Sequence, residues 1–171
     1  IITTVYPFIM RRKEANIFVH ENVKDLAAVA LEGAAKPFQY IALALDFSAN
    51  DGKVMRYALQ LAGANAHFVL IHVVESASAR KIGQDAHDYE TRQDQQHLDE
   101  YVTFFTGRGY KADGLLGYKD RAPEIARIVK EQQCDLLIIG SHGHNTAHDI
   151  LYGETINTVR HMIKIPVFIA Q

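Results

Sequence analysis

Short apolar runs that alternate with amphipathic segments are the feature of this sequence that most constrains its fold. Each run has the length of a β-strand rather than that of a long buried helix. They lie at residues 40–45, 66–74, 112–118, 135–140 and 166–170. Strands that are covered by helices on both faces need no polar side, so runs this continuous indicate buried parallel strands.

The segments between these runs carry apolar residues at helical spacing, and they predict four helices. The apolar faces are marked by Val54, Tyr57, Ala58 and Leu61, by Leu98, Tyr101, Val102 and Phe105, by Ile125, Ile128 and Val129, and by Ile156, Val159 and Ile163. Strands that alternate with helices favour an α/β fold with a doubly wound parallel sheet, because right-handed crossovers place helices on both faces. In such sheets ligands bind at the carboxyl ends of the strands.

Composition and charge narrow the class of function. The chain has 171 residues, of which 48% are hydrophobic and 22% are charged, as in soluble globular proteins. The formal net charge is −2 and no basic run of five or more residues occurs, so we expect no nucleic-acid partner. Cys134, the one cysteine, cannot form an internal disulfide, which favours a reducing cytoplasmic compartment.

The start of the chain is set apart from the predicted α/β unit. We assign residues 1–38 to an N-terminal extension, with a further helix over 23–38, and residues 39–171 to the domain. The apolar first ten residues are shorter than the about 20 that cross a bilayer, but the "RRK" after them is typical of the cytoplasmic end of a spanning helix. Two interpretations stay open: an arm that packs on the domain, or the cytosolic tail of a membrane protein whose spanning part precedes Ile1.

A glycine-rich loop follows the fourth apolar run. Gly140, Gly143 and Gly153 form the pattern G-x2-G-x9-G. Glycines let backbone N–H groups converge on an anion without obstruction by a Cβ atom. We expect the next helix to begin near Glu154, so that its positive dipole end and its unpaired N–H groups face the same place. The loop therefore predicts a phosphate-binding site.

The order of these motifs resembles the universal stress protein family. Near the end of the chain, the fourth predicted strand is followed by "GSHG", then by nine residues and a glycine, and then by a short helix and "IPVFIA". Earlier, "ALD" follows the first predicted strand and "LIHVV" forms the second. The resemblance covers residues 39–171. It implies a flavodoxin-like five-stranded sheet in the order 3-2-1-4-5, often dimerised through its last strand. Some members of the family bind ATP and others do not.

The ATP-binding pattern of the family implies roles at the first two strands. Asp46 would face the ribose and the adenine, and Val73 would offer backbone groups to the adenine. A carboxylate at the carboxyl end of a strand can accept hydrogen bonds from ribose hydroxyls, although Asp46 would also serve as an N-cap for the next helix. Ala44 and Leu45 stand where some nucleotide-binding members carry proline and threonine, which removes a polar contact.

The same pattern implies how the loop would surround the rest of the nucleotide. Gly140 and Gly143, with His142 between them, would enclose the ribose and the phosphates. Gly153 and the residues after it would meet the terminal phosphates.

Glu154 departs from the family pattern, which has serine or threonine directly after the last glycine. Like charges at about 4 Å repel by about 1 kcal/mol in water and by about 4 kcal/mol at an effective dielectric constant of 20. Three arrangements would relieve this repulsion: the Thr155 hydroxyl replaces the missing one, Mg²⁺ bridges Glu154 to phosphate, or the Glu154 side chain points outward. ATP, with or without Mg²⁺, is the predicted ligand. The alternative is an interaction module of the same family that binds no ATP.

Metal binding and catalysis have less support. His142, His144 and His148 lie close together in the loop, but Asp149 is the one carboxylate at tight ligand spacing, and we expect no metal. The sequence has no G-x-S-x-G elbow and no Walker lysine. It therefore predicts a regulatory protein with at most slow ATP hydrolysis, rather than an enzyme.

Overall fold

The computed structural model describes residues 37–74, 81, 89–141 and 149–171, and for 149–153 it describes the backbone alone. Residues 37–171 belong to one compact unit. Most of the predicted N-terminal extension, including its helix, lies outside the described residues. None of the helices in the described ranges combines the length and the apolar character that a bilayer span requires.

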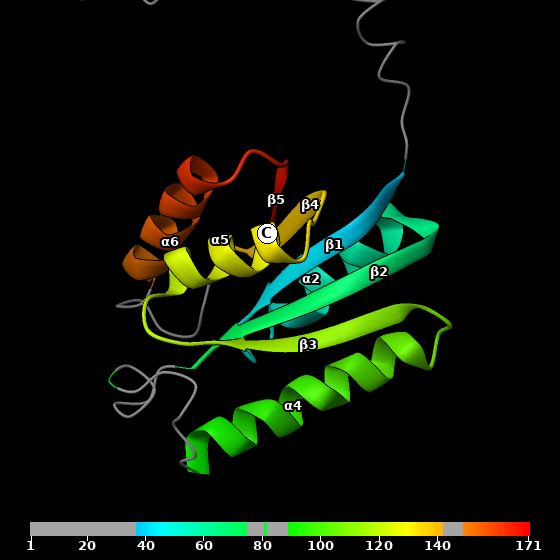
Figure 1. The fold of residues 1–171 in the computed structure, drawn as a ribbon, viewed down its shortest axis with the longest axis horizontal. Helices are drawn as coiled ribbons and strands as arrows, with labels where there is room; N and C mark the ends of the chain where they lie inside the picture. Colours follow the sequence, from blue (N-terminus) through cyan, green and yellow to red (C-terminus); the bar gives the residue numbers. More distant parts are fainter. Residues whose placement is uncertain (1–36, 75–80, 82–88, 142–148) are drawn as a thin grey trace, which may run out of the picture. The chain divides into compact units, whose positions relative to one another are not determined.

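In the described residues of this unit, nine helices and strands alternate along the chain (Figure 1). In chain order they are β1 (Phe38–Leu45), α2 (Asp51–Leu61), β2 (Ala62–Val73), α4 (Tyr89–Thr106), β3 (Lys111–Gly117), α5 (Arg121–Glu131), β4 (Leu136–Gly140), α6 (Asp149–Met162) and β5 (Val167–Ala170). The strands form one parallel sheet in the order β3-β2-β1-β4-β5. The predicted flavodoxin-like fold and its strand order are confirmed.

The centre of the sheet is the pairing of β1 with β2 on one side and β4 on the other. Leu43 pairs with Leu70 of β2 and with Ile138 of β4, and all three side chains are fully buried. From β1 the chain winds outward to β3 and then returns to β4. The carboxyl ends of β1 and β4 therefore form the point at which the winding direction reverses, where doubly wound sheets bind ligands.

Alternate residues of each strand face two separate apolar layers. On one face Ile41 and Phe68 pack against α2 and α4. On the other face Ala42 and Val69 pack against α5 and α6. Because helices cover both faces of the sheet, the strands are continuous apolar runs in the sequence.

β2 and α4 are among the elements that extend beyond their predicted bounds. β2 begins at Ala62, four residues before the predicted start, and its first residues pair irregularly with β1. The register shifts there from Phe38 opposite Ala62 to Tyr40 opposite His67. α4 begins at Tyr89, and its N-terminal half is polar, so the apolar face predicted from later positions marks less than the whole helix.

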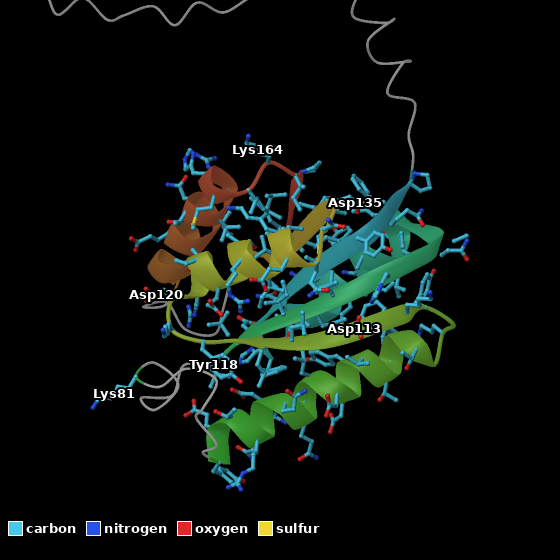
Figure 2. All side chains as sticks on the ribbon, viewed as in Figure 1. Lys81, Asp113, Tyr118, Asp120, Asp135 and Lys164 are labelled. Carbon is cyan, nitrogen blue, oxygen red and sulfur yellow. The ribbon has the colours of Figure 1, made fainter. Side chains whose placement is uncertain are left out.

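An acidic residue holds the amino-terminal ends of the central strands. Figure 2 shows Tyr118 and Asp120 at the edge where β3 ends, and Asp135 at the opposite edge. Asp135 accepts hydrogen bonds from the backbone N–H groups of Gln39 at 2.8 Å and Tyr40 at 3.0 Å. Asp135, the residue directly before β4, thus fixes the start of β1. These contacts lie at the amino-terminal ends of the strands, opposite the carboxyl ends at which doubly wound sheets bind ligands.

Candidate functional site

A cavity of about 220 Å³ opens at the carboxyl ends of the central strands. β1, β2 and β4 each contribute to its lining, together with the N-terminal part of α4, the first turns of α5 and the second turn of α6. Its polar or ionisable lining residues are Asp46, His72, Glu90, Asp94, Arg121 and Thr155. The cavity lies at the reversal point of the sheet, where the topology predicts a ligand site.

Three of the predicted site residues come together in this cavity. Asp46, Val73 and Thr155 all line it, although they belong to distant parts of the sequence. Gly140 ends β4 directly after Ile139, which lines the cavity, but Gly140 is not itself among the lining residues. A Cβ atom at Gly140 would lie 3.7 Å from Asn50 Cβ, an ordinary contact. His142 lies outside the described residues.

Two further predicted residues are not placed at the cavity. Gly143 lies outside the described residues, and Gly153 is described as part of the backbone of α6. Their predicted contacts with phosphate stay predictions.

The start of α6 corrects one expectation. The helix begins at Asp149 and not near Glu154, so Gly153, Glu154 and Thr155 lie in its second turn. A glycine inside a helix costs only about 1 kcal/mol relative to alanine, so Gly153 does not force the helix to start after it. The Glu154 side chain is exposed, whereas Thr155 is 9% exposed and lines the cavity. Of the three arrangements considered for Glu154, this geometry matches an outward carboxylate with Thr155 on the cavity wall.

The turn after β1 is held by a second, buried carboxylate. Asp51 is 2% exposed, and it accepts hydrogen bonds from the backbone N–H groups of Asp46 at 3.3 Å and Phe47 at 2.8 Å. Burial in the first place, and the nearby Asp46 carboxylate in the second, raise the pKa of Asp51 to about 7. Asp46 itself accepts from the N–H of Ser48 at 3.1 Å. Asn50 occupies the N-cap of α2, so the N-cap role considered for Asp46 is wrong.

Phe47 and His72 form an aromatic wall of the cavity. The two rings stack with centroids 4.0 Å apart, and Phe47 has a left-handed backbone with φ of 58°. His72 Nδ1 lies 3.0 Å from the Leu45 carbonyl oxygen, and its Nε2 lies 3.3 Å from Asp94 Oδ2. His72 therefore links the end of β1 to α4, a role that its position inside an apolar strand did not reveal.

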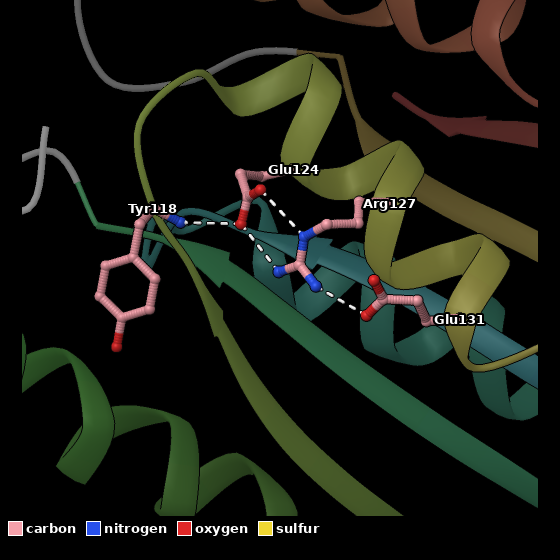
Figure 3. Close-up of polar contacts among 4 residues, drawn as sticks. All are labelled: Tyr118, Glu124, Arg127 and Glu131. Atoms are coloured by element: carbon pink, nitrogen blue, oxygen red, sulfur yellow. Dashed lines mark hydrogen bonds and ion pairs between the residues drawn. The ribbon is translucent and has the colours of Figure 1, made fainter. Parts of the chain in front are cut away.

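Arg121, the first residue of α5, lines the cavity. Figure 3 shows the polar contacts that hold the turn between β3 and α5. Glu124 of α5 accepts from the backbone N–H of Tyr118 at 3.1 Å and pairs with Arg127 at 2.9 Å. The hydrogen bonds from Arg127 lower the pKa of Glu124. Arg127 also contacts Glu131 at 2.6 Å, so the carboxylate that ties the turn to α5 is itself anchored along the helix.

Neither a metal centre nor a reactive thiol is found in the described part of the chain. No three histidine, cysteine or acidic side chains are grouped there as metal ligands would be. The three loop histidines lie outside these residues, so the expectation about metal is untested. Cys134 is buried, and burial raises its pKa to about 11, so it is not a nucleophile near neutral pH.

The sequence did not point to several lining residues. Glu90 and Asp94 lie in the polar half of α4, where charged residues are typical of any solvated helix face. Arg121 follows the carboxyl end of β3, and that position is the one signal that would have nominated it. Phe47 and His72 act through a contact between the turn after β1 and β2, which no local pattern encodes.

Together, the fold and the cavity define a doubly wound α/β domain with a small-molecule site at its reversal point. The chain belongs to the universal stress protein family, whose family model matches residues 37–171. No curated relative matches the chain at a significant level.

Solved structures with the same fold share little sequence with this chain. The hypothetical protein MJ0577 has a TM-score of 0.67 and 18% identity, covering 78% of this chain and 96% of its own. The universal stress protein from Archaeoglobus fulgidus in complex with dAMP has a TM-score of 0.57 and 16% identity, covering 79% and 99%. A universal stress protein in complex with cAMP has a TM-score of 0.55 and 16% identity, covering 79% and 98%. At these identities the similarity shows the fold alone.

Proposed function

We propose that this domain binds a nucleotide, ATP in the first place, in the cavity at the ends of β1, β2 and β4. The observation that carries the proposal is the convergence of Asp46, Val73 and Thr155 on one cavity at the reversal point of the sheet. Nucleotide complexes of two proteins with this fold, one with dAMP and one with cAMP, support the ligand class.

Each described residue has a defined task in this proposal. Asp46 accepts hydrogen bonds from ribose hydroxyls, Val73 offers backbone groups to the base, and the Thr155 hydroxyl donates to a phosphate. The cavity of about 220 Å³ is smaller than the roughly 300 Å³ at which ligand pockets begin. It therefore takes part of the nucleotide, and the terminal phosphates extend beyond it.

The remaining predicted residues complete the phosphate site in this proposal. Gly140, His142 and Gly143 surround the ribose and phosphates, and Gly153 approaches the terminal phosphates. Glu154 either stays in solvent or shares a Mg²⁺ ion with the phosphates. Binding then changes the surface that the domain presents to a second copy or to another protein, since a ligand shifts the population toward the state it prefers.

Isothermal titration with ATP, ADP and AMP, with and without Mg²⁺, tests this proposal. We expect binding that Thr155→Val weakens about tenfold, because one hydrogen bond to a charged phosphate is lost. The matched control is Thr103→Val, since Thr103 is exposed on α4 and donates to the Asp99 carbonyl at 2.8 Å. Absence of both heat and thermal shift at millimolar nucleotide would remove ATP as the ligand.

A second candidate is an interaction module that binds no ATP. β5 is an edge strand of the sheet, and its Ile169 side chain is 42% exposed, which favours pairing with the same strand of a second copy. We therefore include a homodimer through β5 in either function. If wild type binds no nucleotide and Glu154→Ser creates binding, the interaction module is the correct assignment.

Attachment to a membrane protein is compatible with both candidates. In that case the domain acts on the cytosolic side, as the regulatory tail of a transporter. The residues encoded upstream of Ile1 test this hypothesis: several apolar segments of about 20 residues would support it. An initiating methionine directly before Ile1 would contradict it.

A further inference from the structure

The polar residues that the helices contribute to the cavity differ in charge between the two faces of the sheet. α4, which packs on one face, contributes Glu90 and Asp94. α5 and α6, which pack on the other face, contribute Arg121 and Thr155. A ligand in this cavity therefore meets carboxylates on one side and a guanidinium with a hydroxyl on the other.

Asp94 is held in a defined position on the acidic side. Its side chain is 16% exposed, and its Oδ2 atom lies 3.3 Å from His72 Nε2. The His72 ring is fixed in turn by the Leu45 carbonyl and by stacking on Phe47. A carboxylate has about four acceptor positions, so contact with His72 leaves room for a ligand donor.

We propose that Asp94, assisted by Glu90, selects a nucleotide whose base carries an exocyclic amino group. This inference rests on the proposed nucleotide site, and it adds the carboxylates that recognise the base. Arg121 and Thr155 attract the phosphate end, and the base is thereby directed toward α4. There an amino group donates to the carboxylate, as amino groups of bases do to aspartate and glutamate elsewhere.

An oxo group at the same place has the opposite effect. The carbonyl of hypoxanthine or uracil presents an acceptor to an acceptor, so the two repel and neither is satisfied. Because the carboxylate of Asp94 is mostly removed from solvent, water cannot fully replace the missing donor. AMP and CMP are therefore preferred over IMP and UMP.

The experiment is isothermal titration of the full chain with AMP and IMP, and with CMP and UMP. We expect each amino-bearing nucleotide to bind about tenfold or more tightly than its oxo partner. Asp94→Asn places a donor at the site, so the preference for AMP over IMP is expected to shrink to about twofold or to reverse.

Two further variants keep the test informative. Glu90→Gln changes an exposed residue of α4, and it is expected to reduce the same preference even if Asp94→Asn perturbs the fold. Asp99→Asn is the matched control: Asp99 is exposed on α4, accepts from Gln95 Nε2 at 2.8 Å and is not among the residues that line the cavity. It is expected to leave the preference unchanged.

The outcomes separate this inference from the proposed function. Equal binding of AMP and IMP to wild type overturns the selection by Asp94 and leaves the nucleotide site standing. If the preference for AMP over IMP survives in both Asp94→Asn and Glu90→Gln, the selection by Asp94 is also overturned, because another group then recognises the base. If none of the four nucleotides binds, the proposed function fails and the inference fails with it.

Discussion

The buried carboxylate of Asp51 accepts a hydrogen bond of 2.8 Å from the backbone N–H of Phe47. Phe47 has a left-handed backbone with φ of 58°, which is unfavourable for a residue with a bulky side chain. The same carboxylate accepts from the N–H of Asp46. Asp51 therefore stabilises the turn that brings Asp46 and the Phe47 ring to the cavity.

This arrangement predicts that stability depends on pH through Asp51. Its pKa rises from 3.8 to about 7 on folding, so the folded state holds a proton that the unfolded state releases. The stability from this proton is fully present below about pH 4 and is lost as the pH rises through about 7. As the pH rises from about 5 to about 8, the free energy of unfolding should fall by about 3 kcal/mol through Asp51, since about two units lie between pH 5 and its folded pKa and each corresponds to about 1.4 kcal/mol.

Urea unfolding across this pH range, compared between wild type and Asp51→Asn, measures the effect. The variant should lose about 1 kcal/mol at low pH, because its amide can accept only one of the two backbone hydrogen bonds. It should then show a smaller decline as the pH rises. Equal slopes in the two proteins would contradict the assignment, and Asp99→Asn, on the exposed surface of α4, should retain the wild-type slope.

Gly114 of β3 is predicted to tolerate no side chain. A Cβ atom there would lie 2.9 Å from Leu98 Cγ and 3.1 Å from Val102 Cγ2, so α4 would have to shift. Gly114→Ala should lower the free energy of unfolding by about 1–3 kcal/mol, as overpacking does. Chemical denaturation measures it.

The control for this substitution is Gly52→Ala. A Cβ atom at Gly52 meets nothing within 4 Å, and the residue is exposed in α2. Alanine there should raise stability by about 0.5–1 kcal/mol through helix propensity alone. Equal effects of the two substitutions would show that contact with α4 does not limit Gly114.

Asp135 is predicted to be a structural residue at the edge of the sheet opposite the cavity. Asp135→Ala removes both acceptors for the N–H groups of Gln39 and Tyr40. We expect a loss of about 2 kcal/mol in the free energy of unfolding, since hydrogen bonds to charged groups contribute more than neutral ones. Nucleotide affinity should be unchanged; a tenfold loss of affinity without a loss of stability would contradict this role.

The proposed dimer through β5 predicts a specific effect of Ile169→Lys. A lysine on an exposed edge strand opposes pairing with another edge, because its charge would be buried between the two copies. Light scattering coupled to size exclusion should show a dimer for wild type and a monomer for the variant. The exposed Met162 of α6 provides the control, since Met162→Lys should leave the dimer intact. A wild type that is monomeric at every concentration would end the proposal.

The strand order and a minority of the cavity residues could be predicted from sequence, and particular residues show why. Continuous runs such as residues 135–140 signal strands buried on both faces, and the resemblance to a known family supplies their order. Asp46 and Val73 stand at or next to the ends of such runs, so topology alone brings them to one edge. The start of α6 was predicted wrongly because Gly153 was taken as the residue before the helix, whereas the helix contains Gly153.

Local chemistry along the chain thus determined the α/β class, the two covered faces and the edge at which a ligand binds. Only the tertiary structure decided which polar side chains share the cavity. Asp94 of α4 meets His72 of β2, and the Phe47 ring stacks on His72, across contacts between distant parts of the chain. The physical reason is that hydrophobic periodicity reports which face of an element is buried, while the charge of a pocket depends on side chains that packing brings together from distant positions.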